Sequence, residues 1–160
     1  MQSFSTADLC DTNDPGIDVA APIFTDFGGR SSFGGEIATV RVRNDNVLVR
    51  AALEEPGGRR VLVIDGAGSL DCALLGDRLA AIAYAKGWAG IILNGCVRDT
   101  ESLETIPLGV KALGAHPRKS EKHGSGVRGE PVSFAGVEFR QGDFVYADRD
   151  GIIVSDRSLL

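Results

Sequence analysis

The sequence lacks the features of a membrane, secreted or nucleic-acid-binding protein. No apolar run in its 160 residues approaches the roughly 18 to 20 residues that a membrane-spanning helix needs. The first residues, MQSFSTADLCDTND, contain neither a basic start nor an apolar segment, so they do not resemble a secretory signal. Asp and Glu (22) outnumber Lys and Arg (17), and the net charge of -5 argues against the basic face of a nucleic-acid binder. We therefore expect a soluble protein that binds neither membranes nor nucleic acids.

Cysteine is scarce, and its spacing excludes a disulfide framework. The three cysteines, Cys10, Cys72 and Cys96, are an odd number spread widely along the chain. This usage is typical of reduced thiols in a cytosol, so we expect a cytoplasmic protein. No histidine stands at a motif-like spacing to activate Cys96, which we interpret as a small packing residue.

Two further motifs are absent. His116 and His123 have no close partner spacing for zinc, so both are expected to be loop residues. The glycine cluster VIDGAGSL, residues 63–70, lacks the spaced G-x-G-x-x-G of a dinucleotide site. We interpret it as a structural loop that helps to shape the wall of a site.

The composition that is present is that of an ordinary globular protein. Apolar residues make up 43% of the chain and charged residues 24%. No linker divides the chain, so residues 1–160 are expected to form one domain with a sizeable core.

A βαβ unit is the clearest structural pattern. The β-branched run RRVLVIDG, residues 59–66, predicts a strand that is buried on both faces. A helix follows over GDRLAAIAYAKGW, with Leu79, Ile82 and Ala83 on one face, and Gly87 ends it. The run AGIILN is the next strand. Residues 60–94 are therefore expected to form a βαβ unit with parallel strands.

Shorter elements flank this unit. We expect a first helix capped by Ser5 or Thr6, and a helix that Asp45 or Asn46 caps and that runs to Leu53. Between them a glycine-rich bend leads into a strand. That strand, residues 36–42, alternates an apolar face (Ala38, Val40 and Val42) with a more polar face (Ile37, Thr39 and Arg41).

The second half of the chain carries short strand patterns separated by glycines, within residues 106–117, 131–147 and 150–155. Asp150-Gly151 is a hairpin-turn signal. The fold class predicted is α/β, with a parallel βαβ core and antiparallel C-terminal strands.

The stretch IILNGCVRDTESL places a cation and an anion, Arg98 and Asp99, just after a buried strand. A helix that begins at Asp77 rises roughly 15 Å, and the six-residue strand after it returns roughly 20 Å. Arg98 and Asp99 should therefore lie beside Asp77, at the carboxyl edge where ligands bind in open α/β sheets. The helix start also offers unpaired N–H groups that can seat a carboxylate or phosphate. These are the backbone N–H groups of Gly76, Asp77, Arg78 and Leu79.

This arrangement predicts an active site. Arg98 is suited to grip a carboxylate or to stabilise a developing oxyanion. Asp99 is suited to hold Mg²⁺ or Mn²⁺, which need only one or two protein carboxylates, and Asp77 to orient or deprotonate a metal-bound water. The alternative is a solvated Arg-Asp turn, with Asp77 favoured at the helix start only by the dipole.

A basic segment, HPRKSEKHGSG, brings together Arg118, Lys119, Lys122 and His123. It is either a solvated loop or a mobile cover that adds positive charge towards a dianionic substrate.

The chain resembles the family named for regulation of ribonuclease activity, which includes metal-dependent 4-hydroxy-4-methyl-2-oxoglutarate aldolases. The likeness runs from TADLCD through FGGRSSFGG, VLVIDGAGSLDCALLGD, GCVRD and GVKALGAHPRKS to YADRDGIIV. The pattern of the aldolase branch is an Asp, twenty residues and then Arg-Asp. It is matched here by Asp77 and Arg98-Asp99, whereas members that act only as regulators are expected to lack these acidic residues. One departure is Ser102, where the branch often has an acidic residue that Glu101 could replace.

The resemblance implies a swivelling β/β/α domain, a homotrimer and a divalent metal cofactor. It implies retro-aldol cleavage of 4-hydroxy-4-methyl-2-oxoglutarate to two pyruvates, and decarboxylation of oxaloacetate through the same enolate. Asp77 and Arg98 are then the catalytic residues. Residues 76–79 and Arg98 bind substrate, and Asp99 is the metal ligand. The alternative function is a non-catalytic regulator that binds and inhibits a ribonuclease of the E type. A quinone-biosynthesis methyltransferase needs a methyl-donor site, and no motif for one is found.

Overall fold

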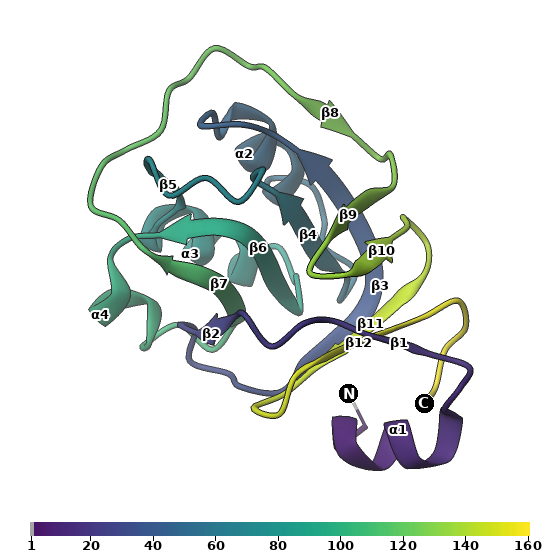
Figure 1. The fold of residues 1–160 in the computed structure, drawn as a ribbon. Helices are drawn as coiled ribbons and strands as arrows, with labels where there is room; N and C mark the ends of the chain where they lie inside the picture. Colours follow the sequence, from purple (N-terminus) through teal and green to yellow (C-terminus); the bar gives the residue numbers. More distant parts are fainter. Residues whose placement is uncertain (1) are drawn as a thin grey trace.

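A curved mixed sheet runs through the molecule in the computed structural model, which describes residues 2–160 (Figure 1). The strands up to residue 97 are β1 (Asp18–Val19), β2 (Thr25–Asp26), β3 (Phe33–Arg41), β4 (Val61–Asp65), β5 (Ala73–Leu75) and β6 (Gly90–Val97). Those after it are β7 (Gly109–Ala115), β8 (Val127–Arg128), β9 (Val132–Phe134), β10 (Val137–Phe139), β11 (Phe144–Ala147) and β12 (Ile152–Ser155). The helices are α1 (Thr6–Asn13), α2 (Val47–Leu53), α3 (Asp77–Ala85) and α4 (Thr100–Leu103).

The centre of the sheet is parallel, as the βαβ pattern predicts. The strand order is β1-β12-β11-β3-β4-β6-β7-β2, with β5 beside β6 and β8 beside β3. Strand β4 pairs in parallel with β6, and α3 connects them. Strand β7, from the second half of the chain, also pairs in parallel with β6. The parallel core therefore includes a strand beyond the predicted βαβ unit of residues 60–94. The class, a single α/β domain with a mixed sheet, is confirmed.

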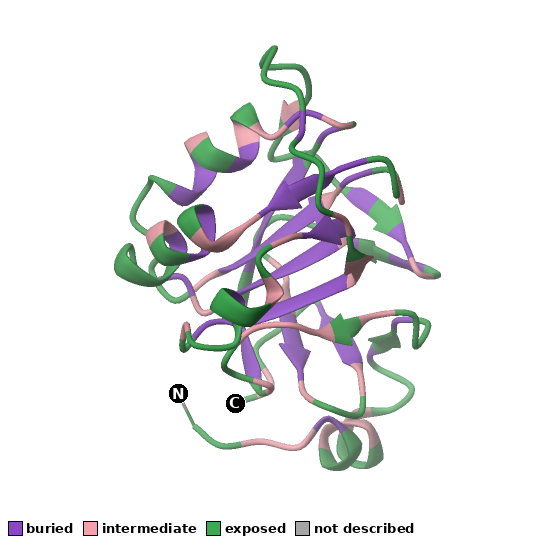
Figure 2. Ribbon diagram, turned by 90° about the vertical axis from the view of Figure 1, so that its left-hand side faces the viewer, coloured by how far each residue is buried: buried purple, intermediate pink, exposed green. Residues whose placement is uncertain are grey.

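Two apolar cores lie on opposite faces of this parallel centre. Helices α2 and α3 cover one face (Figure 1), where Leu62 and Ile64 of β4 share a buried core with Ala80 and Ala83 of α3. The β9–β10 hairpin lies over the other face, where Val63 packs in the second core. Figure 2 shows the central strands mostly buried, whereas parts of the edge strands and the outer sides of the helices are exposed. Both faces are covered, in keeping with the continuous apolar run of β4 from Val61 to Ile64.

Strand β3 differs from the sequence expectation on its more polar face. Ile37 and Thr39 are as deeply buried as the apolar face, with 1% and 2% of their surfaces exposed. The hydroxyl of Thr39 donates a hydrogen bond of 2.7 Å to the carbonyl of Glu130, which replaces its contact with water. The segment before β9 therefore covers part of the face that the local pattern describes only as more polar.

An aromatic ring explains two glycines at the start of the parallel strands. A Cβ added at Gly90 would lie 2.2 Å from the Phe33 ring, and one at Gly109 would lie 2.1 Å from it. Phe33 therefore packs across β6 and β7 only because both positions lack a side chain.

The ends of the chain meet at one side of the sheet (Figure 1). Strands β11 and β12 form the hairpin that Asp150-Gly151 predicts. Asp148, before that turn, accepts hydrogen bonds of 2.7 Å from the Thr6 amide and 2.6 Å from the Thr6 hydroxyl, which fastens α1 to the hairpin. The Ser5 hydroxyl accepts a bond from the Asp8 amide, as expected of an N-cap.

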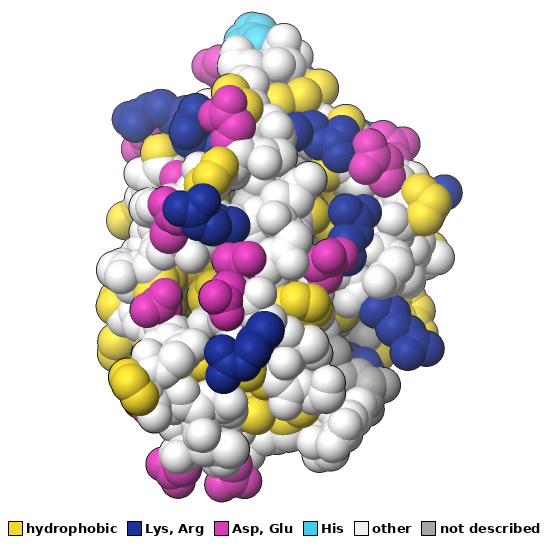
Figure 3. All heavy atoms as spheres, turned by 90° about the vertical axis from the view of Figure 1, so that its right-hand side faces the viewer, with side chains coloured by type: hydrophobic (Ala, Val, Ile, Leu, Met, Phe, Trp, Pro, Cys, Tyr) yellow, Lys and Arg dark blue, Asp and Glu magenta, His cyan; other side chains and the backbone are white. Residues whose placement is uncertain are grey.

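The described residues contain no helix that is long and apolar enough to cross a bilayer. The cysteines Cys10, Cys72 and Cys96 are free thiols, in agreement with the expected absence of a disulfide framework. Figure 3 shows that one face of the molecule intersperses cations and anions rather than presenting a continuous basic surface.

Candidate active site

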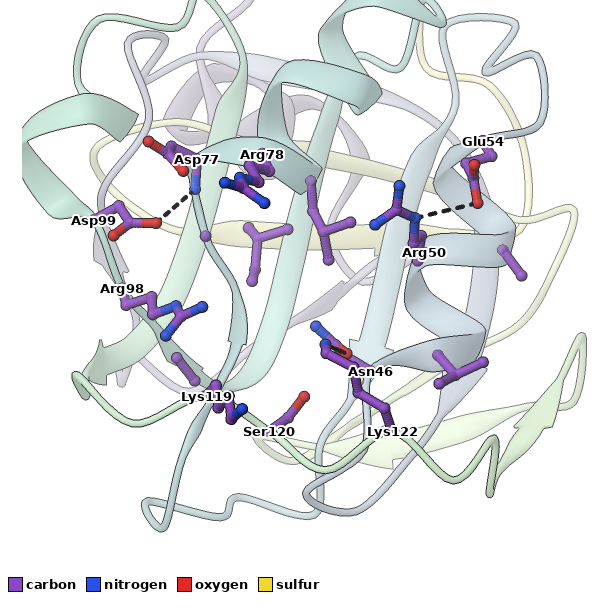
Figure 4. A pocket seen from close by; sticks show the side chains of 16 residues that line it. Asn46, Arg50, Glu54, Asp77, Arg78, Arg98, Asp99, Lys119, Ser120 and Lys122 are labelled. Atoms are coloured by element: carbon purple, nitrogen blue, oxygen red, sulfur yellow. Dashed lines mark hydrogen bonds and ion pairs between the residues drawn. The ribbon is translucent and has the colours of Figure 1, made fainter.

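A pocket of about 810 Å³ opens between α2 and α3, at the carboxyl edge of β5 and β6 (Figure 4). It contains every site residue predicted from the sequence: Gly76, Asp77, Arg78, Leu79, Arg98 and Asp99. It is further lined by Asn46, Val47, Arg50, Ala51, Glu54, Ala73, Leu75, Lys119, Ser120 and Lys122. The return of the chain along β6 therefore brings Arg98 and Asp99 to the start of α3, as the lengths of the two elements predict.

Asp99 is held at the helix start by an unusual backbone conformation. It has φ 61° and ψ 44°, in the left-handed region that non-glycine residues seldom adopt. Its Oδ2 accepts a hydrogen bond of 3.1 Å from the N–H of Asp77. The side chain thereby caps α3 from outside, because the N-cap residue, Gly76, has no side chain to do so.

Gly76 leaves the space that Asp99 occupies. A Cβ at this position would lie 2.6 Å from Oδ2 of Asp99 and 3.4 Å from Cγ of Arg98. The first distance is shorter than real carbon–oxygen contacts allow, so any other residue here would displace the carboxylate.

The N–H groups at the start of α3 are not all free for a ligand. The N–H of Asp77 is bound by Asp99. Those of Arg78 and Leu79 lie in the first turn, where the helix itself supplies no acceptor. The anion seat predicted from the sequence is therefore narrower than four N–H groups, and it centres on Arg78 and Leu79.

Arg98 and Asp99 are neighbours in sequence but do not pair with each other. Among the described residues, Arg98 forms no ion pair with any carboxylate. Its guanidinium extends into the cavity while Asp99 turns towards α3 (Figure 4). Arg98 and Asp99 therefore do not neutralise each other, and the Arg98 guanidinium is available to bind an anionic ligand.

Positive charge predominates in the pocket. Its cations are Arg50, Arg78, Arg98, Lys119 and Lys122, and its anions are Glu54, Asp77 and Asp99. Arg50 pairs with Glu54 at 3.5 Å, while Lys122 donates a hydrogen bond of 2.9 Å to the neutral Asn46. This balance favours an anionic ligand.

Part of the lining was not identified from the sequence: Asn46, Arg50 and Ser120. Asn46 was recognised only as a possible helix cap, and its side chain instead donates to the Leu74 carbonyl at 3.2 Å. Ser120 stands within the basic segment, where no local pattern marks a serine as part of a site. No sequence motif marks Arg50 or Ser120. Both reach the pocket only because of how α2 and the segment after β7 pack.

The basic segment contributes Lys119 and Lys122 to the pocket, whereas Arg118 and His123 lie outside its lining. Buried Asp45 anchors the segment. Its Oδ2 accepts N–H bonds at 2.6, 2.9 and 3.4 Å from residues 123–125, and its Oδ1 accepts the N–H of Val47 at 3.0 Å. Burial alone raises the pKa of Asp45, but these bonds outweigh burial and lower the pKa. Asp45 thereby joins the start of α2 to the segment that carries the two lysines.

Several other candidates lie outside the pocket lining. Cys96 is buried, and burial raises the pKa of its thiol, which supports a packing role. The glycine loop 66–70 does not reach the pocket. Glu101 and Ser102 are exposed on α4 and do not line it either.

The donor chemistry at this edge fits a divalent cation that keeps most of its waters. Asp99 keeps one carboxylate oxygen that is not bonded to the Asp77 N–H, and Asp77 lines the same pocket. The described residues contain no group of three His, Cys, Asp or Glu side chains that could enclose a metal ion. One or two protein carboxylates suffice for Mg²⁺ or Mn²⁺, which favour oxygen ligands, whereas Zn²⁺ prefers nitrogen and sulfur.

Comparison with known proteins places this pocket in a family context. Residues 6–154 match the RraA-like family model, described as Aldolase/RraA. A relative from Aromatoleum aromaticum named "Putative 4-hydroxy-4-methyl-2-oxoglutarate aldolase" is 52% identical over 98% of this chain and 99% of its own.

Two solved structures share the fold. The RNA-processing inhibitor RraA from Thermus is 45% identical with a TM-score of 0.95, covering 99% of this chain and 96% of its own. A structure from Geobacillus kaustophilus, named as an S-adenosylmethionine: 2-dimethylmenaquinone methyltransferase, is 49% identical with a TM-score of 0.94 and covers 98% and 97%. The three names assign different activities to closely similar chains, so the residues of the pocket must distinguish between them.

Proposed function

Since the chain belongs to the RraA-like family of aldolases and RraA proteins, we propose that it is a metal-dependent carbon–carbon lyase. Its substrate is 4-hydroxy-4-methyl-2-oxoglutarate, which it cleaves to two molecules of pyruvate, and it decarboxylates oxaloacetate through the same enolate. The observation that carries the proposal is the convergence of Asp77, Arg98 and Asp99 in one positively charged pocket.

The cleavage needs a sink for electrons at the 2-oxo group. The 4-hydroxyl loses its proton, the C3–C4 bond breaks, and the electron pair moves through C3 and C2 onto the 2-oxo oxygen. One pyruvate leaves, and the enolate of the second takes a proton at C3. With oxaloacetate, the same bond breaks to release carbon dioxide, and the enolate is protonated in the same way.

The residues of the pocket fit these demands. The guanidinium of Arg98 forms no ion pair with a carboxylate in the described part of the chain, and it stabilises the oxygen on which charge develops. The N–H groups of Arg78 and Leu79 seat the neighbouring carboxylate. The Asp77 carboxylate, at the same edge, exchanges the proton through a water.

Asp99 is the residue that would hold Mg²⁺ or Mn²⁺, with water completing the coordination shell. When bound, the ion supplies Lewis-acid polarisation of the 2-oxo group. The Asp77–Asp99 hydrogen bond orients one oxygen of Asp99 and leaves the other available.

Metal-supplemented turnover tests the proposal. Purified protein is incubated with each substrate and with Mg²⁺, Mn²⁺ or EDTA, and pyruvate release is measured. We expect release with either metal and none with EDTA, above a background set by the Asp99→Asn variant. No release from either substrate with either metal overturns the proposal.

A second candidate function is direct inhibition of an E-type ribonuclease. The Thermus relative, named as an RNA-processing inhibitor, favours it. Endonuclease assays with wild type and Asp99→Asn separate the two functions, because binding through the outer surface does not need the pocket carboxylate. The methyltransferase name of the Geobacillus structure gains no support from the glycine loop 66–70, which does not line the pocket.

We further propose that the protein assembles as a homotrimer, in keeping with the family resemblance. Light scattering coupled to size-exclusion chromatography measures the mass directly, and a particle of one 16.8 kDa chain overturns the assembly.

A further inference from the structure

Ser120 is a buried polar residue without a partner in the pocket. It is 5% exposed, and its Oγ has no hydrogen-bond partner among the described residues. A buried hydroxyl left unsatisfied costs free energy, so such groups in native proteins call for a partner. Figure 4 shows the Ser120 hydroxyl directed towards the cavity, between Arg98 and Asn46. A ligand in the pocket is therefore placed to supply the missing partner.

The surroundings of Ser120 indicate that this partner is an anion. Lys119 and Lys122 come from the same segment and line the same pocket. In the described residues neither lysine forms an ion pair, and Lys122 is bound only to the neutral side chain of Asn46. A hydroxyl donor beside two ammonium groups is suited to a carboxylate.

The pocket is large enough for the region around Ser120 to be separate from the region around Arg98, where the enolate is proposed to form. Its volume of about 810 Å³ lies in the range that holds drug-sized ligands, which is roughly 300 to 1,000 Å³. A three-carbon acid seated at Arg98 and the first turn of α3 therefore leaves room beside Ser120. A second carboxylate on the same substrate can reach that room.

We propose that Ser120, with Lys119 and Lys122, binds the distal carboxylate of the substrate and so selects dicarboxylic 2-oxo acids over monocarboxylic ones. The inference takes the identity of the substrate from the proposed function. Its test measures ligand binding alone and does not depend on that function. Ser120 is a specificity-determining residue in this assignment, and it takes no part in breaking the bond.

Ligand binding tests the assignment without turnover. The probes are 2-oxoglutarate, which has both carboxylates but no 4-hydroxyl and is not cleaved, and pyruvate, which has one carboxylate. Dissociation constants are measured by calorimetry with Mg²⁺ present, in wild type, Ser120→Ala, Lys119→Gln and the control Ser125→Ala. Ser125 is an exposed serine of the same segment and does not line the pocket.

We expect wild type to prefer 2-oxoglutarate, and Ser120→Ala to reduce that preference roughly tenfold or more, since hydrogen bonds to charged groups are among the stronger ones. Lys119→Gln should reduce it in the same direction, and this exposed position carries little risk of misfolding. Ser125→Ala should leave the preference unchanged.

The outcomes separate the two proposals. A wild type that prefers 2-oxoglutarate through Ser120 but releases no pyruvate from either substrate supports this inference and overturns the proposed function. Active wild type with no preference, or equal losses of both ligands in Ser120→Ala and Lys119→Gln, overturns this inference alone. Equal losses mean that these residues do not distinguish the two ligands. An unchanged preference in Ser120→Ala also overturns the inference and means that water satisfies the Ser120 hydroxyl.

Discussion

The carboxylate of Asp99 accepts a hydrogen bond from the backbone N–H of Asp77, with 3.1 Å between Oδ2 and N. This bond joins the end of β6 to the start of α3. One carboxylate thus caps a helix and presents its second oxygen at the pocket, which links the local stability of the site to its chemistry.

Replacing Asp99 should separate these two roles. Asp99→Asn keeps an oxygen acceptor for the Asp77 N–H and tolerates the left-handed conformation, but it loses the negative charge. Asp99→Ala loses both and removes the cap, which is typically worth about 1 kcal/mol. We expect both variants to lose metal-dependent pyruvate release, and only Asp99→Ala to lower the unfolding free energy measurably. Full activity of Asp99→Ala without excess metal contradicts the ligand assignment.

Gly76→Ala should lower activity although it replaces no charged residue. Its Cβ lies 2.6 Å from Oδ2 of Asp99, so the carboxylate must move and the Asp77 bond must lengthen. We expect a fall in kcat/KM of roughly 10-fold or more, because small misplacements of site groups are costly. The matched control is Gly151→Ala, where the added Cβ meets no atom within 4 Å. Similar kinetics for both variants would show that the close approach at Gly76 has no functional consequence.

Arg98→Ala should lower kcat by roughly 100-fold or more, the usual scale for the loss of one oxyanion donor. Arg98→Lys keeps the charge but not the planar fork, so we expect only partial recovery. Oxalate resembles the planar enolate, and its binding should weaken more than that of pyruvate because Arg98 acts mainly on the developing charge. Inhibition constants of both ligands in wild type and Arg98→Ala measure this. Equal losses make Arg98 a carboxylate clamp, and no loss of either makes it a surface turn.

Asp45→Ala should destabilise the protein in a pH-dependent manner. The variant removes the acceptor of four N–H groups that join α2 to the basic segment, and we expect a loss of about 2 kcal/mol in the free energy of unfolding at pH 7. The hydrogen bonds lower the folded-state pKa, so this contribution is fully present above the unfolded pKa of about 3.9. It is lost as the pH falls through the lower folded-state value.

Denaturant unfolding of wild type and Asp45→Ala between pH 3 and 7 provides the measurement. The stability difference should narrow at the acid end. Asp156→Ala serves as the control, because its side chain is 82% exposed and should give no comparable difference. A difference that stays constant down to pH 3 argues against stabilisation by the ionised carboxylate.

Much of the parallel core is determined by local sequence. The β-branched run of β4, the apolar face of α3 and the strand after it are short-range patterns, and secondary structure with its direction follows from them. Their lengths also place Arg98 and Asp99 beside Asp77, because a helix and a returning strand have fixed rises per residue. The parallel centre of the sheet and the Arg98–Asp99 side of the pocket can therefore be predicted from the sequence.

The other side of the pocket was decided only by tertiary structure. The bond between Asn46 and Lys122 joins residues 76 positions apart, and no local period relates them. The same holds for the unpartnered hydroxyl of Ser120 and for the burial of Thr39, which depends on the segment before β9. Periodicity reports which residues share a face of one element, whereas contact between distant elements depends on how their surfaces pack. The sequence by itself thus determined the elements and the Arg98–Asp99 edge, and packing decided which further side chains complete the pocket.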